Sequence, residues 1–264
     1  MNGAMLETAE LAYMLATIDA SGLIGVDDPK LLPSSAKAQE ATFSKGRKQL
    51  EAHGWIQPIP DKPGEHDLNA GLFQLVAVAA APEQVIATSA GESPDDRRQV
   101  LHYLAEELIV ELWATSDKSY FLTSLPDRAA LNQRMTELLG LAKSAQEGQI
   151  TLTASAFNKL KSHAQKGQQA QAEKLLEASE ANGPAAKSLL AALGSSARGR
   201  VVVIRASAGE IAAGRRAELF GEKKGAWMAV RPNADSNELT LSPVDPVALE
   251  ALVEGWLGEL GPAA

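Results

Sequence analysis

Along the first third of the chain, apolar side chains recur three and four positions apart, which is the period of an amphipathic helix. This spacing predicts helices over residues 7–20, 35–53 and 69–81. Thr8 is expected to cap the first helix, and Ser34 or Ser35 the second, because their hydroxyls can accept from free N–H groups of the first turn. Pro82 ends the third helix, since proline cannot donate the next backbone hydrogen bond.

Beyond Pro82 the helical period gives way to short β-branched and aromatic runs bounded by turn residues, which is typical of strands. Strands are predicted at 84–88, 99–105, 108–114, 119–125, 200–206, 217–221, 226–231 and 238–242. The run 99–105 also fits a helix by its period. Its counterpart in the second half precedes the turn-forming Lys223-Lys224-Gly225, which favours a strand. Strands joined by short turns pair antiparallel.

Further helices flank these strands. Asp127, Thr153 and Asp245 each begin a stretch with helical apolar spacing and are expected to cap it. A helix over 170–178 follows Gly167, and another starts near Pro184, whose fixed φ suits the first helical position.

Part of the sequence occurs twice. Ser89-Ala90-Gly91-Glu92 and Ser207-Ala208-Gly209-Glu210 are identical, and four residues later each is followed by an arginine pair, Arg97-Arg98 or Arg215-Arg216. Each copy then has a tryptophan, a Leu-Thr pair and an Asp-x-x-Ala-Leu segment. The repeat predicts two similar halves packed about a pseudo-two-fold axis.

The predicted fold class is therefore α+β, with helices, about four antiparallel strands and a closing helix in each half. The halves are expected to span 1–148 and 149–264 and to form one globular unit. The repeat does not decide whether their sheets share a central antiparallel sheet.

Composition narrows the function. The formal net charge of −8 argues against a nucleic-acid-binding protein, because binding to phosphates needs a positive field. The absence of cysteine excludes disulfides and thiolate metal sites. We expect no signal peptide, because no basic segment followed by an apolar run opens the chain, and no membrane span. A cytoplasmic location fits these features.

The repeated Ser-Ala-Gly-Glu segments can be read as anion-binding loops or as plain turns. We favour turns, because each has a single glycine and no Lys-Ser or Lys-Thr after it, unlike a phosphate-binding loop. The arginine pairs could contact an acidic partner. We favour solvated residues on an exposed strand, where charge discourages edge pairing.

No other segment predicts chemistry. Glu65-His66-Asp67 is the single local cluster of metal-ligand residue types, but no second cluster accompanies it. Glu106-Glu107 and Asp95-Asp96 fall in predicted turns, and no serine lies in a Gly-x-Ser-x-Gly elbow. We therefore predict no catalytic, cofactor-binding or metal-ligating residue, and no cofactor. All four tryptophans are expected to be buried, Trp113 and Trp227 in the sheet core, and Trp55 and Trp256 at helix ends.

The three N-terminal helices resemble the outline of a winged helix. However, the segment that would read DNA, residues 69–81, has no basic residue, whereas such helices usually carry one. The small basic cluster Lys45, Arg47 and Lys48 is better read as a solvated helix face.

The order of elements also resembles the EspG-type adaptors of ESX (type VII) secretion systems. One helix ends in Leu50-Glu51-Ala52-His53-Gly54-Trp55-Ile56, and Ala81-Pro82-Glu83 opens the first long strand. The helices between Thr153 and Leu193 lead into Gly199-Arg200-Val201-Val202-Val203, and the strand Glu238 to Ser242 precedes Pro243 and a terminal helix.

This resemblance implies a pseudo-two-fold fold with a central antiparallel sheet. It also implies a cytosolic, non-enzymatic protein that binds secretion substrates and keeps them soluble. Phe220 to Gly225 replaces an acidic turn that bears glycine and arginine in the mycobacterial members, so a PE/PPE-type substrate and the family's binding residues are not carried over.

Three functions follow as hypotheses. The first is a protein-binding adaptor, a secretion chaperone whose partner is a secretion substrate or another helical protein. The second is a DNA-binding regulator, which would bind DNA through residues 1–80. The third is an enzyme of unrecognised type, which would need Asp, Glu and His to converge in a pocket.

Overall fold

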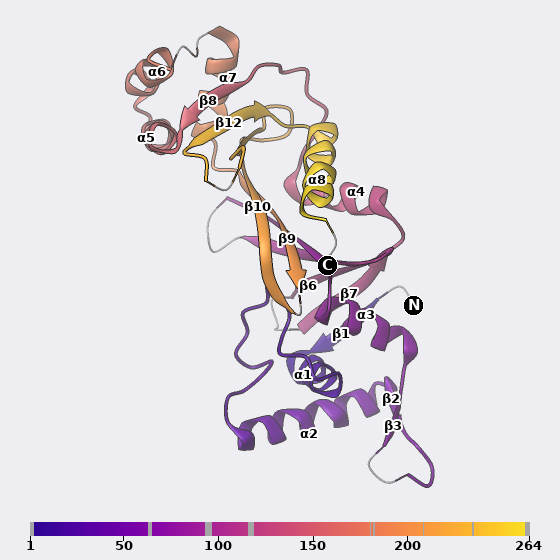
Figure 1. The fold of residues 1–264 in the computed structure, drawn as a ribbon. Helices are drawn as coiled ribbons and strands as arrows, with labels where there is room; N and C mark the ends of the chain where they lie inside the picture. Colours follow the sequence, from indigo (N-terminus) through magenta and orange to yellow (C-terminus); the bar gives the residue numbers. More distant parts are fainter. Residues whose placement is uncertain are drawn as a thin grey trace.

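The computed structural model describes residues 3–62, 65–92, 97–115, 119–179, 181, 183–207, 209–233 and 235–261. Within these residues eight α-helices surround a ten-stranded antiparallel sheet, with a separate two-stranded hairpin (Figure 1). The α+β class predicted from the sequence is confirmed.

The first half contains β1 (Ala4–Glu7), α1 (Thr8–Thr17), α2 (Ala36–Ala52), β2 (Ile56–Pro58), β3 (His66–Leu68), α3 (Ala70–Ala80), β4 (Gln84–Gly91), β5 (Arg98–Ala105), β6 (Leu108–Ala114), β7 (Ser119–Leu125) and α4 (Arg128–Leu139). The second contains β8 (Ile150–Thr153), α5 (Ala154–Gln165), α6 (Gln169–Glu177), α7 (Gly183–Gly194), β9 (Arg198–Ser207), β10 (Glu210–Phe220), β11 (Trp227–Val230), β12 (Glu238–Pro243) and α8 (Pro246–Leu260).

The two half-sheets merge into one. The strand order is β1-β7-β6-β5-β4-β9-β10-β11-β12-β8, so the halves meet where β4 pairs antiparallel with β9. That pairing runs from Gln84 opposite Arg205 to Gly91 opposite Arg198. This central pair settles the question that the repeat left open.

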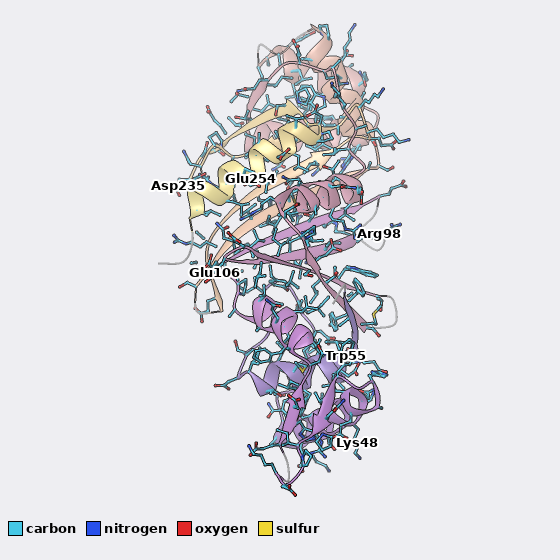
Figure 2. The ribbon with its side chains drawn as sticks, turned by 90° about the vertical axis from the view of Figure 1, so that its right-hand side faces the viewer. Lys48, Trp55, Arg98, Glu106, Asp235 and Glu254 are labelled. Carbon is cyan, nitrogen blue, oxygen red and sulfur yellow. The ribbon has the colours of Figure 1, made fainter. Side chains whose placement is uncertain are left out.

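The sheet has two faces with different covers. Alternate residues along β9 face opposite ways, as in any strand. Val203 packs with α4 and α8, whereas Ile204 packs with α1 and α3. Phe220 of β10 lies opposite Arg198, on the Ile204 face, and packs with α5, α6 and α7. One face is therefore covered by α4 and α8, and the other by two separate helical layers at opposite ends of the molecule (Figures 1 and 2).

Most predicted helix starts are confirmed. The side chains of Ser35, Asn69, Asp127, Thr153 and Asp245 each accept a backbone N–H of the first helical turn. The prediction that Thr8 caps the first helix is wrong. The cap of α1 is Glu7, whose backbone N–H donates to the Glu10 carboxylate at 2.8 Å. Reciprocal bonding between these two acidic residues places the helix start one residue earlier.

Three strand features were not predicted. β1 and β8 form the two ends of the sheet, and each alternates buried and exposed over four residues, too short a run for a clear pattern. The third feature is the hairpin of β2 and β3, in which Ile56 pairs with Leu68 and Pro58 with His66. Its proline and charged residues hide a strand signal.

Candidate functional site: a basic groove on the central sheet

The middle of one sheet face is left open between the two helical layers. On β9 the residues of this face are Arg200 and Val202, and on β10 they are Gly214, Arg216 and Glu218, because cross-strand partners point the same way. Val202 and Glu218 are partly exposed and Arg216 is exposed. Charged side chains thus occupy the middle of this face, whereas apolar residues cover it under the helices at either end, such as Ile204 and Phe220.

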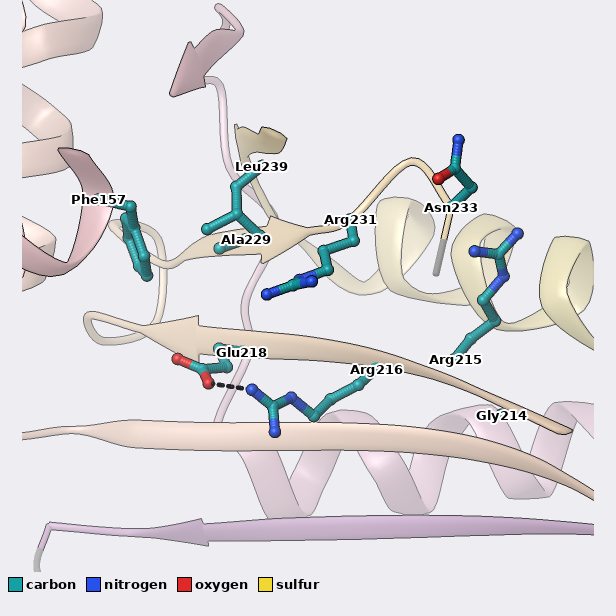
Figure 3. Close-up of a pocket in the computed structure, with 9 residues that line it drawn as sticks. All are labelled: Phe157, Gly214, Arg215, Arg216, Glu218, Ala229, Arg231, Asn233 and Leu239. Atoms are coloured by element: carbon teal, nitrogen blue, oxygen red, sulfur yellow. Dashed lines mark hydrogen bonds and ion pairs between the residues drawn. The ribbon is translucent and has the colours of Figure 1, made fainter. Parts of the chain in front are cut away.

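Two adjoining hollows occupy this open strip. One has a volume of about 230 Å³, and its lining includes Arg97, Lys161, Arg198, Arg200 and Glu218. The second, of about 160 Å³, lies where β10 and β11 diverge and includes Phe157, Gly214, Arg216, Glu218 and Arg231 (Figure 3). We call the residues lining both hollows the basic groove.

The basic groove opposes the charge of the chain as a whole. Seven basic and two acidic residues line it, whereas the full sequence carries a net charge of −8. The acidic residues are Glu92 and Glu218, and the basic ones are Arg97, Lys161, Arg198, Arg200, Arg216, Arg231 and Arg215. The Arg215 side chain points to the α8 face, where it pairs with Glu259, so six cations face the groove. A concave surface lined with one sign of charge concentrates its field and attracts ligands of the other sign.

Glu218 joins the two hollows. Its carboxylate accepts from Lys161 Nζ of α5 at 3.3 Å and from Arg216 Nη2 at 2.8 Å. The Lys161 ammonium also lies 5.9 Å from the centre of the Phe157 ring, a cation–π distance. One carboxylate therefore partly neutralises two of the six cations.

Two arginines of β9 differ in their engagement. Arg198 donates to the carbonyl oxygens of Leu193 at 2.9 Å and Ala197 at 2.7 Å, and burial lowers the pKa of its guanidinium. Arg200 lies opposite Glu218 in the strand register, yet within the described residues its side chain makes no hydrogen bond or ion pair. Arg200 is therefore a free cation in the floor of the basic groove.

The repeated segments adopt different structures. Ser89 to Gly91 lie in β4, paired with β9, so the prediction of a turn is wrong for the first copy. In the second copy Gly209 has φ +79° and closes the hairpin between β9 and β10, as predicted for a turn. The identical tetrapeptides differ in their strand neighbours. The first pairs with β5 on one side and β9 on the other, whereas, among the described residues, Ser207 of the second pairs only with β10.

The arginine pairs are not simply solvated. Arg215 forms an ion pair with Glu259 of α8, and Arg216 forms one with Glu218. Arg97 lines the basic groove, whereas Arg98 is exposed where β5 begins (Figure 2). Arg98 pairs with Ala90 of β4, but within the described residues the pairing of β5 with β6 begins only at Val100, so Arg98 is an exposed arginine on a strand segment with one free side, as predicted.

The other candidate residues have structural partners. His66 Nε2 lies 3.0 Å from the Glu51 carboxylate, and no three potential metal ligands converge within the described residues. Glu106 and Glu107 form the turn between β5 and β6, as predicted, and Asp95-Asp96 lie outside the described residues. Of the basic cluster on α2, Lys45 pairs with Glu7 and Arg47 with Glu51, while Lys48 is exposed (Figure 2).

The tryptophans divide into two groups. Trp227 and Trp256 are buried, and Trp227 Nε1 donates to Ser188 Oγ at 3.0 Å. Trp113 and Trp55 are only partly buried, so the prediction of burial fails in part for these two. Trp113 lies against Phe121, with the ring centres 5.4 Å apart.

A buried ionic network was missed by the sequence reasoning. On the face covered by α4, His102 Nε2 lies 3.1 Å from the Glu111 carboxylate, which also accepts from Arg134 Nε at 3.0 Å and Nη2 at 2.9 Å. Burial alone would raise the pKa of Glu111, but the hydrogen bonds from His102 and Arg134 outweigh it and lower the pKa to about 2. His102 and Glu111 are each 1% exposed, which closes this network to a substrate.

The helix predicted as the DNA reader has another role. α3 buries Leu72, Leu75, Val76, Val78 and Ala79 and packs onto β5, β6 and β7. A recognition helix presents polar or basic side chains to the major groove, whereas the exposed positions of α3 are Ala70, Phe73 and Gln74.

No family model matches the sequence, and no curated protein matches it. Among solved structures, the chain is similar to the Mycobacterium tuberculosis type VII secretion system chaperone EspG5, solved in complex with the PE25-PPE41 dimer. The TM-score is 0.68 at 13% sequence identity, over 99% of this chain and 98% of EspG5. This chain therefore has the EspG5 fold over nearly its whole length. None of the described helices has the length and apolar character needed to cross a bilayer.

Proposed function

We propose that this protein is a non-enzymatic, cytoplasmic protein-binding adaptor of EspG-like type, a secretion chaperone whose basic groove holds its partner. The observation that carries the proposal is the uncovered centre of the sheet, where basic side chains gather in an otherwise acidic chain. The EspG5 fold adds support, since that chaperone was solved bound to a protein dimer.

The shape and charge of the groove favour an acidic helical segment as the partner's contact. The floor is formed by β9 and β10, and α5 forms one wall through Lys161 and Gln165. A helix laid in such a groove can present carboxylates to Arg200 and Lys161, which is one of the recurring modes of peptide recognition. Complementary charge of this kind speeds association and excludes unsuitable partners.

We further propose that residues 1–148 and 149–264 are pseudo-two-fold-related halves of one globular unit. Outward from the central pair, the strands follow the order β4-β5-β6-β7-β1 in one half and β9-β10-β11-β12-β8 in the other. An experimental structure in which the halves superpose after a rotation near 180° would support this relation, and halves that fail to superpose would refute it.

The test begins with affinity capture of the tagged protein from its native lysate, with and without nuclease, and identification of stoichiometric partners. The captured partner is then purified and titrated against Arg200→Glu, Lys161→Glu and the double variant. We expect each single change to weaken binding by at least about tenfold, as for other charges truncated or reversed at an interface.

Matched controls lie outside the groove. Arg98→Glu reverses an exposed arginine of the same sheet, and Lys174→Glu reverses an exposed lysine on α6. Both should bind the partner as the unaltered protein does. Equal binding by the groove variants would refute the proposed site, and recovery of DNA that is lost on nuclease treatment would favour the regulator instead.

A further inference from the structure

One strand of the central sheet extends well beyond its neighbour. β10 pairs with β9 from Glu210 to Phe220, but it pairs with β11 only from Ala217 to Phe220. Within the described residues, the seven positions from Glu210 to Arg216 therefore have no strand partner on the β11 side. A strand edge of this kind presents backbone N–H and C=O groups that can pair with another extended chain.

This internal edge is longer than the outer edges of the sheet, although a bulge between Ile211 and Ala213 interrupts its register with β9. β1 and β8, which end the sheet, have four residues each. Along the β10 edge Ile211 is 63% exposed, and Glu210, Ala212 and Gly214 are also exposed. The glycine leaves the edge free of a side chain beside the hollow where β10 and β11 diverge.

The charges around this divergence select the occupant. Arg216 and Glu218 lie on the same face of β10. The pairing of β10 with β11 ends where Ala217 lies opposite Val230; one residue further, Arg216 would lie opposite Arg231. Figure 3 shows Arg231 extending from the end of β11 toward the gap, while Arg216 lies along β10 toward Glu218; both residues line the hollow. Among the residues that the structure describes, Glu218 is the only carboxylate lining this hollow, and it also accepts from Lys161; the Arg231 side chain there donates only to the Ser236 carbonyl oxygen. Arg216 and Arg231 therefore outnumber the single carboxylate, and the hollow keeps a net positive charge.

We infer that the Glu210–Arg216 edge of β10 binds an extended, acidic segment of a partner protein by adding it to the sheet as a strand. The backbone of that segment would pair with β10, and its alternate side chains, aspartate or glutamate, would lie between Arg216 and Arg231. This inference rests on the proposed function, because it presumes a protein partner. It concerns the hollow between β10 and β11, whereas Arg200 lines the other hollow of the basic groove.

The probe is a fluorescein-labelled peptide of alternating glutamate and valine, titrated against the full chain by anisotropy. Hydrogen–deuterium exchange reports which amides become protected. We expect protection at 210–216, and binding at least about tenfold weaker for Arg231→Glu, since a reversed charge faces the peptide. Arg98→Glu, an exposed arginine that does not line this hollow, should leave peptide binding unchanged.

Two control peptides separate backbone pairing from simple charge attraction. A peptide with lysine in place of glutamate should not bind. A glutamate peptide N-methylated at every second residue keeps its charge but loses half of its backbone donors, and it should bind at least about tenfold more weakly, because strand addition depends on main-chain hydrogen bonds.

Three outcomes would overturn the inference. One is no protection of 210–216 at millimolar peptide, and another is equal binding of the N-methylated peptide. The third is concentration-dependent self-association in sedimentation that protects 210–216 without peptide, which would assign the edge to a second copy of this chain. A partner that loses affinity with Arg200→Glu but not with Arg231→Glu would keep the proposed function while removing the strand contact.

Discussion

Two carboxylates of the same sheet, Glu111 and Glu218, each bond to two basic side chains, yet their surroundings differ. Glu111, with His102 and Arg134, lies sealed beneath α4, whereas Glu218, with Lys161 and Arg216, lies in the open groove. Glu111 is 1% exposed and has its pKa lowered to about 2, and the Glu218 side chain is 27% exposed. The same residue chemistry is therefore sealed from solvent on one face and open to solvent on the other.

Removing the charge of Glu111 should have the largest effect. Glu111→Gln keeps the shape of the side chain but leaves His102 and Arg134 facing a neutral amide inside the sheet. Breaking a buried ion pair typically costs about 3 to 5 kcal/mol, and the partly exposed Arg134 places this case at the lower end, about 3 kcal/mol. Urea unfolding at neutral pH measures the loss, and a value below about 1 kcal/mol would contradict a stabilising role.

Acid should reproduce this effect in the unaltered protein. The folded-state pKa of Glu111 is lowered from 4.5 to about 2, so its stabilising contribution is complete above the unfolded value and is lost as pH falls from 4.5 toward 2. A shift of this size corresponds to about 3 kcal/mol of unfolding free energy. The measurement is urea unfolding at several pH values across this window. Glu111→Gln should lack this part of the acid dependence, and identical pH curves for both proteins would exclude Glu111 as its source.

The open carboxylate should behave differently. Glu218→Gln is expected to change the unfolding free energy by no more than about 1 kcal/mol, because exposed ion pairs contribute little. It also frees Lys161 and Arg216, so an acidic partner should bind several times more tightly, the reverse of the effect of Arg200→Glu. Urea unfolding and titration with the captured partner test both parts. Weaker binding would mean that Glu218 itself contacts the partner.

The difference between these two regions also marks what the sequence can reveal. Local signals were sufficient for the helix caps at Asp127, Thr153 and Asp245 and for the hairpin of β6 and β7, because each depends on residues close in the chain. The basic groove depends on β9 pairing with both β4 and β10 and on α5 lying across β10. No local pattern encodes those pairings.

The identical tetrapeptides make the same point within the sheet. Ser89 in β4 and Ser207 at the end of β9 begin identical tetrapeptides, so a rule that reads only those four residues gives them one structure. Ser89 instead lies opposite Arg200 inside the sheet, whereas Ser207 lies opposite Glu210 in a hairpin. Tertiary pairing overrides local preference here, as it often does for strands.

The smallest effect on stability is expected at Arg200, and this variant serves as the control for the effect of Glu111→Gln on stability. The Arg200 side chain makes no hydrogen bond or ion pair within the described residues, so Arg200→Ala should change the unfolding free energy by less than about 0.5 kcal/mol, as at surface sites without special contacts. Thermal unfolding measures this directly. If Arg200→Ala keeps its stability and loses partner affinity, the loss belongs to the groove surface. If it unfolds as readily as Glu111→Gln, the open and sealed regions are not energetically distinct, and binding losses at Arg200 would reflect the fold.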